Sequence, residues 1–222
     1  MREIYLNFHG LGSPPKHAGI DERPYWLTLE RFTAILKLVE TYESPHWKIG
    51  ITFDDGNKSD VETALPILRM MKRRASFFLT SDMVGTPGFV GPDDIGHLRD
   101  AGMEIGSHGA AHVKWTTLDD AELTAQVDRS LRILSGVVGQ PITSIAVPFG
   151  AYNRRVLRVL NSFDLVTIFT SDGGSVRPGT RLKSRNSIRM DTSLEAIEIL
   201  LCGLPIQQRI RFASRRWVRR HF

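Results

Sequence analysis

The sequence predicts a single α/β domain in which about seven parallel strands form a distorted (β/α) barrel. Short apolar runs that suit buried strands alternate with amphipathic stretches along most of the 222 residues. This alternation is typical of βαβ units and of a mostly parallel sheet. About seven such units in one domain of this length favour a barrel, and a doubly wound open sheet is the structural alternative.

Seven apolar runs are expected to be the strands. They occupy residues 4–8, 48–53, 75–80, 103–107, 144–149, 165–170 and, least regularly, 184–190. Amphipathic stretches between them predict helices over residues 28–42, 59–74, 92–102, 117–139, 152–162 and 193–203. Pro92 opens the third helix, and Thr117 or Asp119 can cap the fourth. Gly102 and Gly139 follow the ends of these two helices.

The composition is that of an ordinary globular protein. Hydrophobic residues make up 41% of the chain, which provides for a sizeable core. The single cysteine, Cys202, excludes an internal disulfide framework and suits a reducing compartment. The first ten residues lack the apolar stretch of a secretory signal, and no segment has the length and apolarity of a membrane span. We therefore expect a soluble, cytoplasmic protein.

The positive charge is concentrated at one end of the chain. The formal net charge is +5, and the segment from Pro205 onward contains six arginines and no acidic residue. Removing these six charges from the total leaves the rest of the chain at −1. We therefore divide the chain into a domain of residues 1–204 and a basic tail of residues 205–222.

The tail can form an amphipathic helix or remain a disordered, solvated chain end. In a helix, Ile206, Ile210, Ala213 and Trp217 share one face, and arginines occupy the others. Such a helix can lie on an anionic membrane surface, which would make the protein peripheral to the membrane. The pattern suits disorder equally well. Nucleic acid is not an expected partner, because the rest of the chain shows no basic patch in its sequence.

In barrels and in open α/β sheets, ligands bind beyond the carboxyl ends of the strands. The residues that follow the predicted strands are His9, Asp54, Asp55, Ser81, Asp82, Ser107, His108, Pro148, Phe149, Ser171, Asp172 and Arg185 or Arg189. This set is rich in metal ligands and in acid–base groups. The sequence therefore predicts a functional site at this end of the sheet.

Asp54 and Asp55 are adjacent carboxylates at the end of the second predicted strand. Like charges this close disfavour each other's ionisation unless a cation lies beside them. The Asp-Gly sequence alone would also suit a solvated turn. His108 and His112 are four residues apart, so on a helical turn they would face one side and could share a metal ion. Together with one carboxylate they would form a three-ligand site that activates a bound water molecule.

Three segments resemble motifs of the polysaccharide deacetylase family, the NodB-like carbohydrate esterases. They are Thr-Phe-Asp-Asp-Gly at 52–56, Ser-His-Gly-Ala-Ala-His at 107–112 and Val-Pro-Phe-Gly-Ala-Tyr-Asn at 147–153. The resemblance implies a distorted (β/α) barrel, one divalent metal ion and hydrolysis of an acetyl group from a sugar. It also implies that Asp54 is the general base and that Asp55, His108 and His112 bind the metal. Zinc is the expected metal, and cobalt, nickel and iron suit the same ligands.

The third motif departs from the family pattern. Family members often have an arginine there that pairs with the base, but this chain has Ala146 and Val147 at the corresponding positions. Our candidate for the missing arginine is Arg185. The loop residues Pro148, Phe149 and Gly150 are retained, and a backbone N–H near Phe149 could donate to an oxyanion. Asp172 could orient a catalytic group, although its Asp-Gly-Gly sequence also suits a turn.

The histidine that serves many members as the general acid, in a late Leu-x-His motif, has no counterpart after His112 apart from His221 in the tail. His9 instead ends the first predicted strand. A circularly permuted branch of the family, which includes the poly-N-acetylglucosamine deacetylases, carries the acid at this position. The first and last strands of a closed barrel are neighbours, so such a permutation preserves the site. The resemblance therefore implies that His9 protonates the leaving group.

The leading hypothesis is a metal-dependent deacetylase of an acetylated, preferentially N-acetylated, sugar in a polysaccharide, oligosaccharide or glycolipid. Metal-bound water would attack the acetyl carbonyl, with Asp54 as base and His9 as acid. The alternatives are a related amidohydrolase of a small nitrogenous molecule and a non-catalytic carbohydrate-binding relative. Tyr25, Trp26 and Trp115 could stack on a sugar ring or pack in the core.

Overall fold

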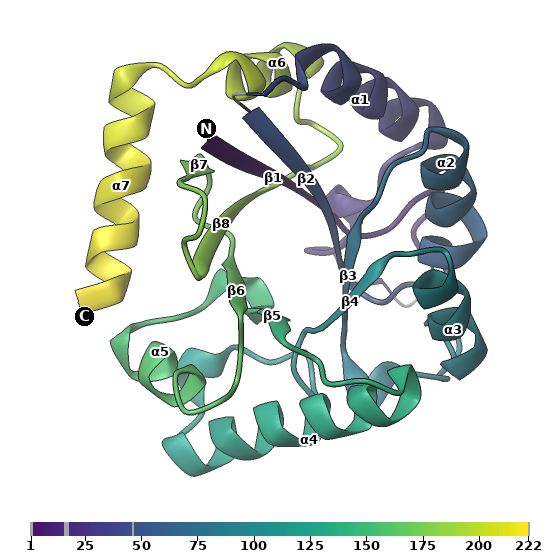
Figure 1. Ribbon diagram of the computed structural model, residues 1–222, viewed down its shortest axis with the longest axis vertical. Coiled ribbons are helices and arrows are strands. Elements are labelled where there is room, and N and C mark those ends of the chain that lie inside the picture. Colours follow the sequence, from purple (N-terminus) through teal and green to yellow (C-terminus); the bar gives the residue numbers. More distant parts are fainter. Residues whose placement is uncertain (1, 16–17, 46, 222) are drawn as a thin grey trace.

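The computed structural model describes residues 2–15, 18–45 and 47–221. Its centre is a closed barrel of seven parallel strands, in the order β2-β3-β4-β5-β6-β8-β1, in which β1 also pairs with β2 (Figure 1). The strands are β1 (Arg2–Phe8), β2 (Trp47–Asp55), β3 (Ser76–Leu79), β4 (Glu104–Ser107), β5 (Ser144–Ala146), β6 (Thr167–Thr170) and β8 (Leu182–Ser187). The predicted (β/α) barrel is therefore confirmed.

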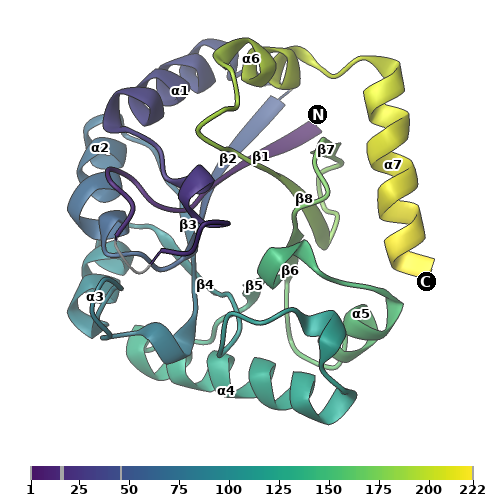
Figure 2. The ribbon, with the colours of Figure 1, turned by 180° about the vertical axis from the view of Figure 1, so that it is seen from behind.

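Helices surround the barrel (Figures 1 and 2). They are α1 (Leu29–Tyr42), α2 (Leu65–Met70), α3 (Pro92–Asp100), α4 (Asp120–Val138), α5 (Arg154–Leu160), α6 (Leu194–Cys202) and α7 (Ile206–His221). The side chain of Asp119 accepts a hydrogen bond from the Glu122 amide, and the Glu122 carboxylate accepts one from the Asp119 amide, so α4 begins with a capping box. Gly139 ends that helix with φ 77°, a conformation that glycine adopts without strain.

The predicted helix over residues 59–74 is shorter than expected. Its first turn, Asp60–Ala64, has π-helical spacing, and the α-helix proper runs only from Leu65 to Met70. Pro66 lacks an N–H, and its ring would clash with the carbonyl four residues earlier in a regular α-helix. The wider first turn avoids that clash.

One strand prediction also needs correction, and one short strand was missed. The run 144–149 ends as a strand at Ala146, because Pro148 starts a turn in which Phe149 has a φ of 58°. The two-residue strand β7 (Ser175–Val176), which pairs antiparallel with β1, was not predicted. Two residues are too few to show any periodicity.

Alternation along the strands separates two layers of side chains. In β1, Ile4, Leu6 and Phe8 belong to the large core under the helices. Tyr5 belongs instead to a small cluster with Phe78 and Phe169, and we place this cluster inside the barrel. Successive strand residues face opposite sides of a sheet, so Asn7 follows Tyr5 toward the interior. By the same rule, Phe53 lies under the helices and the next residue, Asp54, faces the barrel interior.

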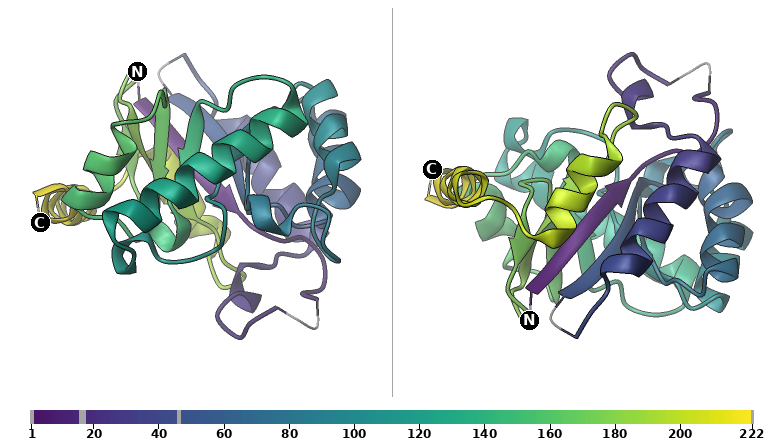
Figure 3. Two further views of the ribbon diagram at one scale, coloured as in Figure 1. Left: turned by 90° about the horizontal axis from the view of Figure 1, so that it is seen from below. Right: turned by 90° about the horizontal axis from the view of Figure 1, so that it is seen from above.

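Two segments outside the barrel bear on function. The connection between β1 and α1 projects beyond the carboxyl ends of the strands (Figure 3). The basic tail, for which helix and disorder were both open, forms α7 beside β7 and β8, on the far side of the barrel from α2 and α3 (Figure 1). Every helix within the described residues is too short or too polar to span a bilayer.

Close packing inside the barrel predicts opposite effects for two glycine substitutions. A Cβ on Gly106 would lie 2.4 Å from the Phe78 ring and 2.7 Å from Ser144 Oγ, so Gly106→Ala should destabilise the fold by about 1–3 kcal/mol. Gly136 in α4 has open space around an added Cβ, so Gly136→Ala should stabilise it by about 0.5–1 kcal/mol. Urea denaturation of both variants tests this. Equal changes in the free energy of unfolding for the two variants would contradict the close packing described around Gly106.

Candidate functional site

Residues from the ends of several strands line one cavity of about 340 Å³. Its polar lining includes His9 after β1, Asp54 and Asp55 in β2, and His108 and His112 after β4. The structure therefore brings together the residues for which a base, an acid and a metal site were predicted. Tyr25, Trp26, Phe89 and Phe149 add aromatic surface to the same cavity.

Asp54 is held by a fully buried arginine from β8. Arg185 donates two hydrogen bonds to its carboxylate, Nη1 to Oδ1 at 2.6 Å and Nη2 to Oδ2 at 2.8 Å. Arg185 is 0% exposed, and its guanidinium lies 5.2 Å and 5.7 Å from the ring centroids of Phe78 and Phe169. Bidentate pairs of this kind are strong and geometrically specific. The arginine absent from the third motif thus has a counterpart at residue 185, beside the candidate base.

Asn7 joins this buried network and was not singled out from the sequence. Its Nδ2 donates to Asp54 Oδ2 at 2.9 Å, and its Oδ1 accepts from Arg185 Nη1 at 2.8 Å. Thr52 Oγ1 donates to the same Asn7 oxygen at 2.7 Å. The alternation of β1 places Asn7 in the barrel, but only the pairing of β1 with β2 and β8 shows which groups it meets.

The ionisation of Asp54 follows from these partners. Burial acts to raise its pKa, but the positive charge of Arg185, with a contribution from His108 and the hydrogen bonds of Arg185, holds the pKa of Asp54 well below its ordinary value. Asp54 is therefore a carboxylate at neutral pH.

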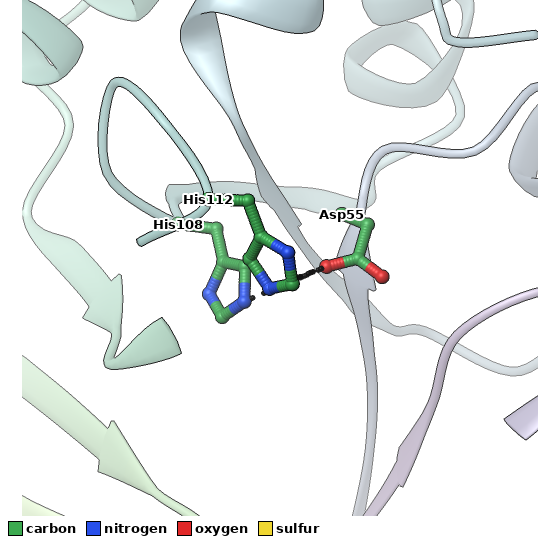
Figure 4. Close-up of side chains that lie close together, drawn as sticks. All are labelled: Asp55, His108 and His112. Carbon is green, nitrogen blue, oxygen red and sulfur yellow. Dashed lines mark ion pairs between the residues drawn. The ribbon is translucent and has the colours of Figure 1, made fainter. Parts of the chain in front are cut away.

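Asp55, His108 and His112 form a compact cluster (Figure 4). Asp55 Oδ1 lies 3.6 Å from His108 Nε2 and 3.5 Å from His112 Nε2, and the three ligand atoms lie within 4.8 Å of one another. Asp55 has a φ of 79°, which is strained for a residue with a side chain. Strain of this kind persists where the surroundings impose it, often at functional sites.

The cluster fits a divalent cation in its chemistry. His108 Nδ1 lies 2.9 Å from the Ala146 carbonyl, which can only accept, so Nδ1 carries the proton and Nε2 offers a lone pair toward Asp55. Burial lowers the pKa of His108 to about 3 and also lowers the pKa of His112, so both imidazoles are neutral, as metal ligands must be. Asp55 Oδ1 is buried and has no hydrogen-bond partner within the described ranges. A cation would give that oxygen a partner.

His9 lies at the end of β1 and lines the same cavity as the two carboxylates. Its ring centroid is 4.7 Å from that of Tyr25, and its Nδ1 is buried without a hydrogen-bond partner. Packing against Tyr25 thus holds the ring at the wall of the cavity.

The loop of Pro148, Phe149 and Gly150 connects the cavity to the C-terminal helix. The Phe149 ring stacks on His112 with centroids 4.2 Å apart, and its φ of 58° turns the chain at this point. Arg219 of α7 donates from Nη1 to the Gly150 carbonyl at 2.9 Å and to Asp172 Oδ1 at 2.8 Å. Asp172 is not part of the cavity lining; its other oxygen accepts from Tyr152 and Thr170. Asp172 therefore acts on the loop indirectly, by holding Arg219 against the Gly150 carbonyl.

Among the aromatic candidates for sugar stacking, Tyr25 and Trp26 line the cavity. Trp115 is 0% exposed and belongs to a hydrophobic cluster with Leu123 and Val127, so its role is packing. Phe89 also lines the cavity but was not singled out from the sequence, because nothing near it resembles a strand end.

The fold and site define a class of barrel proteins that combine an Asp-His-His cluster with an arginine-paired aspartate at the carboxyl ends of the strands. The profile of the polysaccharide deacetylase family matches residues 41–168, more than half of the chain. The chain therefore belongs to the polysaccharide deacetylase family, as the motifs predicted. The match includes Asp54, Asp55, His108 and His112 but leaves out the strands that carry His9 and Arg185.

Curated relatives share low identity with the chain. Chitin deacetylase 1 of Saccharomyces cerevisiae is 26% identical over 122 residues, which are 55% of this chain and 38% of that protein. Peptidoglycan-N-acetylmuramic acid deacetylase PdaC of Bacillus subtilis is 28% identical over 115 residues, 51% of this chain and 24% of that protein. The chain thus spans well under two thirds of the length of these relatives.

Solved structures show the same fold. A polysaccharide deacetylase from Bacillus cereus superposes with a TM-score of 0.78 at 20% identity, over 90% of this chain and 69% of that one. IcaB from Ammonifex degensii superposes with a TM-score of 0.78 at 17% identity, over 90% of this chain and 97% of that one.

We predict that Asp55→Asn stabilises the metal-free protein at about pH 7.5. Burial, together with the charges of Asp54 and Glu22, raises the pKa of Asp55 from 3.8 to about 6. The folded state therefore binds the proton of the Asp55 carboxyl more tightly than the unfolded state does. The stability that the protonated carboxyl contributes is present at low pH and is lost as the pH rises through about 6. At about pH 7.5 the neutral amide of the Asp55→Asn variant avoids the cost of burying a charged carboxylate, about 1–3 kcal/mol of folding free energy. Urea denaturation in chelator tests this at about pH 7.5 and about pH 4.5.

The exposed substitution Asp93→Asn, in α3, serves as the control for Asp55→Asn and should change stability little. A gain for Asp55→Asn that is equal at both pH values would contradict the environment described for Asp55.

We predict that Arg185→Met destabilises the fold by about 3–5 kcal/mol, because it leaves the Asp54 charge buried without its partner. Adding Asp54→Asn to that variant should restore part of the loss, since the unpaired charge is then gone. A double-mutant cycle measured by urea denaturation gives the coupling between the two side chains. Additive losses would show that Asp54 does not depend on Arg185.

Proposed function

We propose that this chain is a metal-dependent deacetylase that removes acetyl groups from an N-acetylated amino sugar within an oligosaccharide, polysaccharide or glycolipid. The observation that carries the proposal is the pair of adjacent carboxylates with opposite environments. Asp54 is kept ionised by Arg185, and Asp55 faces two neutral imidazoles. Groups whose environments push their pKa values apart are suited to separate roles in one reaction.

Asp55, His108 and His112 would hold the metal. A divalent cation there, with zinc the first choice, would polarise the acetyl carbonyl and lower the pKa of a water molecule, which suits a base as weak as Asp54. Asp54 then takes a proton from the attacking water. The hydrogen bonds from Arg185 and Asn7 hold its carboxylate in one orientation, so little reorganisation is needed when the proton arrives.

His9 is the proposed proton donor. The water oxygen bonds to the acetyl carbon, the C–N bond breaks, and His9 gives its proton to the departing nitrogen, so that acetate and a free amine result. Its position in the cavity that Asp54 and Asp55 also line supports this role. The position of His9 directly after β1, a strand that lies between β8 and β2, also supports the likeness to the permuted branch of the family.

Aromatic groups around the cavity support a carbohydrate substrate. Tyr25, Trp26 and Phe149 present ring surface next to the proposed catalytic groups, and aromatic faces can stack on sugars. The relatives named above, chitin and peptidoglycan deacetylases, point to polymers of amino sugars. We propose a substrate of that kind, such as an exopolysaccharide.

Zinc-loaded protein should release acetate from N-acetylglucosamine oligomers, and chelation should abolish the release. Asp54→Asn and His9→Ala should each lower the rate by about 10²–10⁴-fold, because each removes one proton transfer. The matched controls, Asp93→Asn and His97→Ala in α3, should retain full activity. Acetate is measured by a coupled assay, and circular dichroism checks folding of each variant. Full activity of His9→Ala would refute its role as the acid, and activity without metal would refute the metal dependence.

A further inference from the structure

A groove of about 520 Å³ separates α7 from the β7 segment, on the outside of the barrel and away from the candidate catalytic cavity. Its basic lining consists of Arg2, Arg177, Arg209, Arg216 and Arg220, and no acidic residue lines it among the residues that the structure describes. Five like charges around one groove repel one another. The groove is therefore a candidate site for an anion.

The charges in the groove are unpaired within the described part of the chain. None of the five arginines forms an ion pair with a carboxylate there; Arg219, which binds Asp172, faces the catalytic loop instead. Arg216 donates to the Gly173 carbonyl and to Ser184 Oγ, which are neutral groups. The Nε of Arg220 is buried and has no hydrogen-bond partner in the described residues. Guanidinium groups arranged in this way can each donate to an external anion.

The groove also has an apolar edge. Ile206 and Ile210 line it and yet remain 70% and 60% exposed. Trp217, two further turns along the same face of α7, is 56% exposed. The apolar stripe of α7, formed by Ile206, Ile210, Ala213 and Trp217, is therefore continuous with the basic groove. A free inorganic anion would make no apolar contact with this stripe, whereas an anion attached to a hydrocarbon chain would.

We propose that α7 and the groove bind an anionic lipid surface, with a lipid phosphate in the groove and the apolar stripe in contact with the acyl chains. Helices with a basic face and a separate apolar face lie in the membrane interface in this way. Acidic headgroups attract such a surface, and each arginine near the surface adds to the binding. The proposal does not depend on the proposed enzymatic activity, since binding alone tests it.

The test is co-sedimentation of the full chain with vesicles of phosphatidylcholine, with and without phosphatidylglycerol. The chain should bind the anionic vesicles and not the neutral ones, and added salt should weaken the binding. Arg177→Gln with Arg209→Gln should weaken it about fivefold for each arginine, because each guanidinium near the surface contributes to binding. Both side chains are exposed, so the fold should tolerate the changes. The control pair Lys37→Gln and Arg69→Gln removes two exposed charges from α1 and α2 and should leave binding unchanged.

A second pair of variants tests the apolar stripe. Ile206→Ser with Ile210→Ser should reduce vesicle binding about tenfold or more, while the charge is unchanged. Vesicles with brominated acyl chains should quench the tryptophan fluorescence, and Trp217→Phe should remove most of that quenching.

Equal binding to neutral and anionic vesicles would overturn the proposal, and so would full binding by the double-arginine variant. Calorimetric binding of inorganic phosphate without any vesicle binding would also overturn it, because the groove would then be a site for a small soluble anion. Loss of vesicle binding in both variant pairs, with the control pair unchanged, would establish the groove and the stripe as one lipid-binding surface.

Discussion

The buried ion pair between Arg185 and Asp54 is the interaction on which the rest of the site depends. Two strands supply the pair, Asp54 from β2 and Arg185 from β8, and a third supplies Asn7, from β1, which hydrogen-bonds to both. A buried pair needs partners for its remaining polar atoms, and Asn7 and Thr52 supply some of them here. Arg185 Nε is buried and has no hydrogen-bond partner among the described residues. Because Arg185 already neutralises Asp54, the neighbouring Asp55 is the carboxylate left to a cation.

Two consecutive residues thus have different chemistry for reasons of geometry. Asp54 follows the alternation of β2 into the barrel, where an arginine lowers its pKa. Asp55 leaves the strand with a positive φ and reaches two histidines, and burial raises its pKa. The repulsion between adjacent carboxylates is met by two cationic partners instead of one, a protein guanidinium for Asp54 and, in our proposal, a metal ion for Asp55.

Much of the fold was predictable because strands and helices in this chain show their own periodicity and the site residues follow strand ends. Arg185 could be suggested only because an arginine was missing near Ala146, and its contact with Asp54 depends on the neighbouring positions of β8 and β1. Asn7 was missed because its contacts with Asp54 and Arg185 likewise depend on which strands are neighbours in the barrel. Arg219 could not have been found, because a basic amphipathic tail fits both a docked helix and a disordered end, and only the docked helix brings it to Gly150. The roles of these residues in catalysis remain predictions.

The position of β1 between β8 and β2 also has a consequence for how the chain folds. Neighbouring strands from β2 to β6 can pair in chain order, but β8 must meet a strand that begins at Arg2, and Arg185 must meet Asp54, 131 residues away. Contacts between such distant segments form slowly, because the entropy of loop closure is lost before they stabilise anything. Until the ring closes, β8 and β1 have unpaired edges and Asp54 lacks its arginine. Closure of the barrel and assembly of the site are therefore expected to be one and the same folding event.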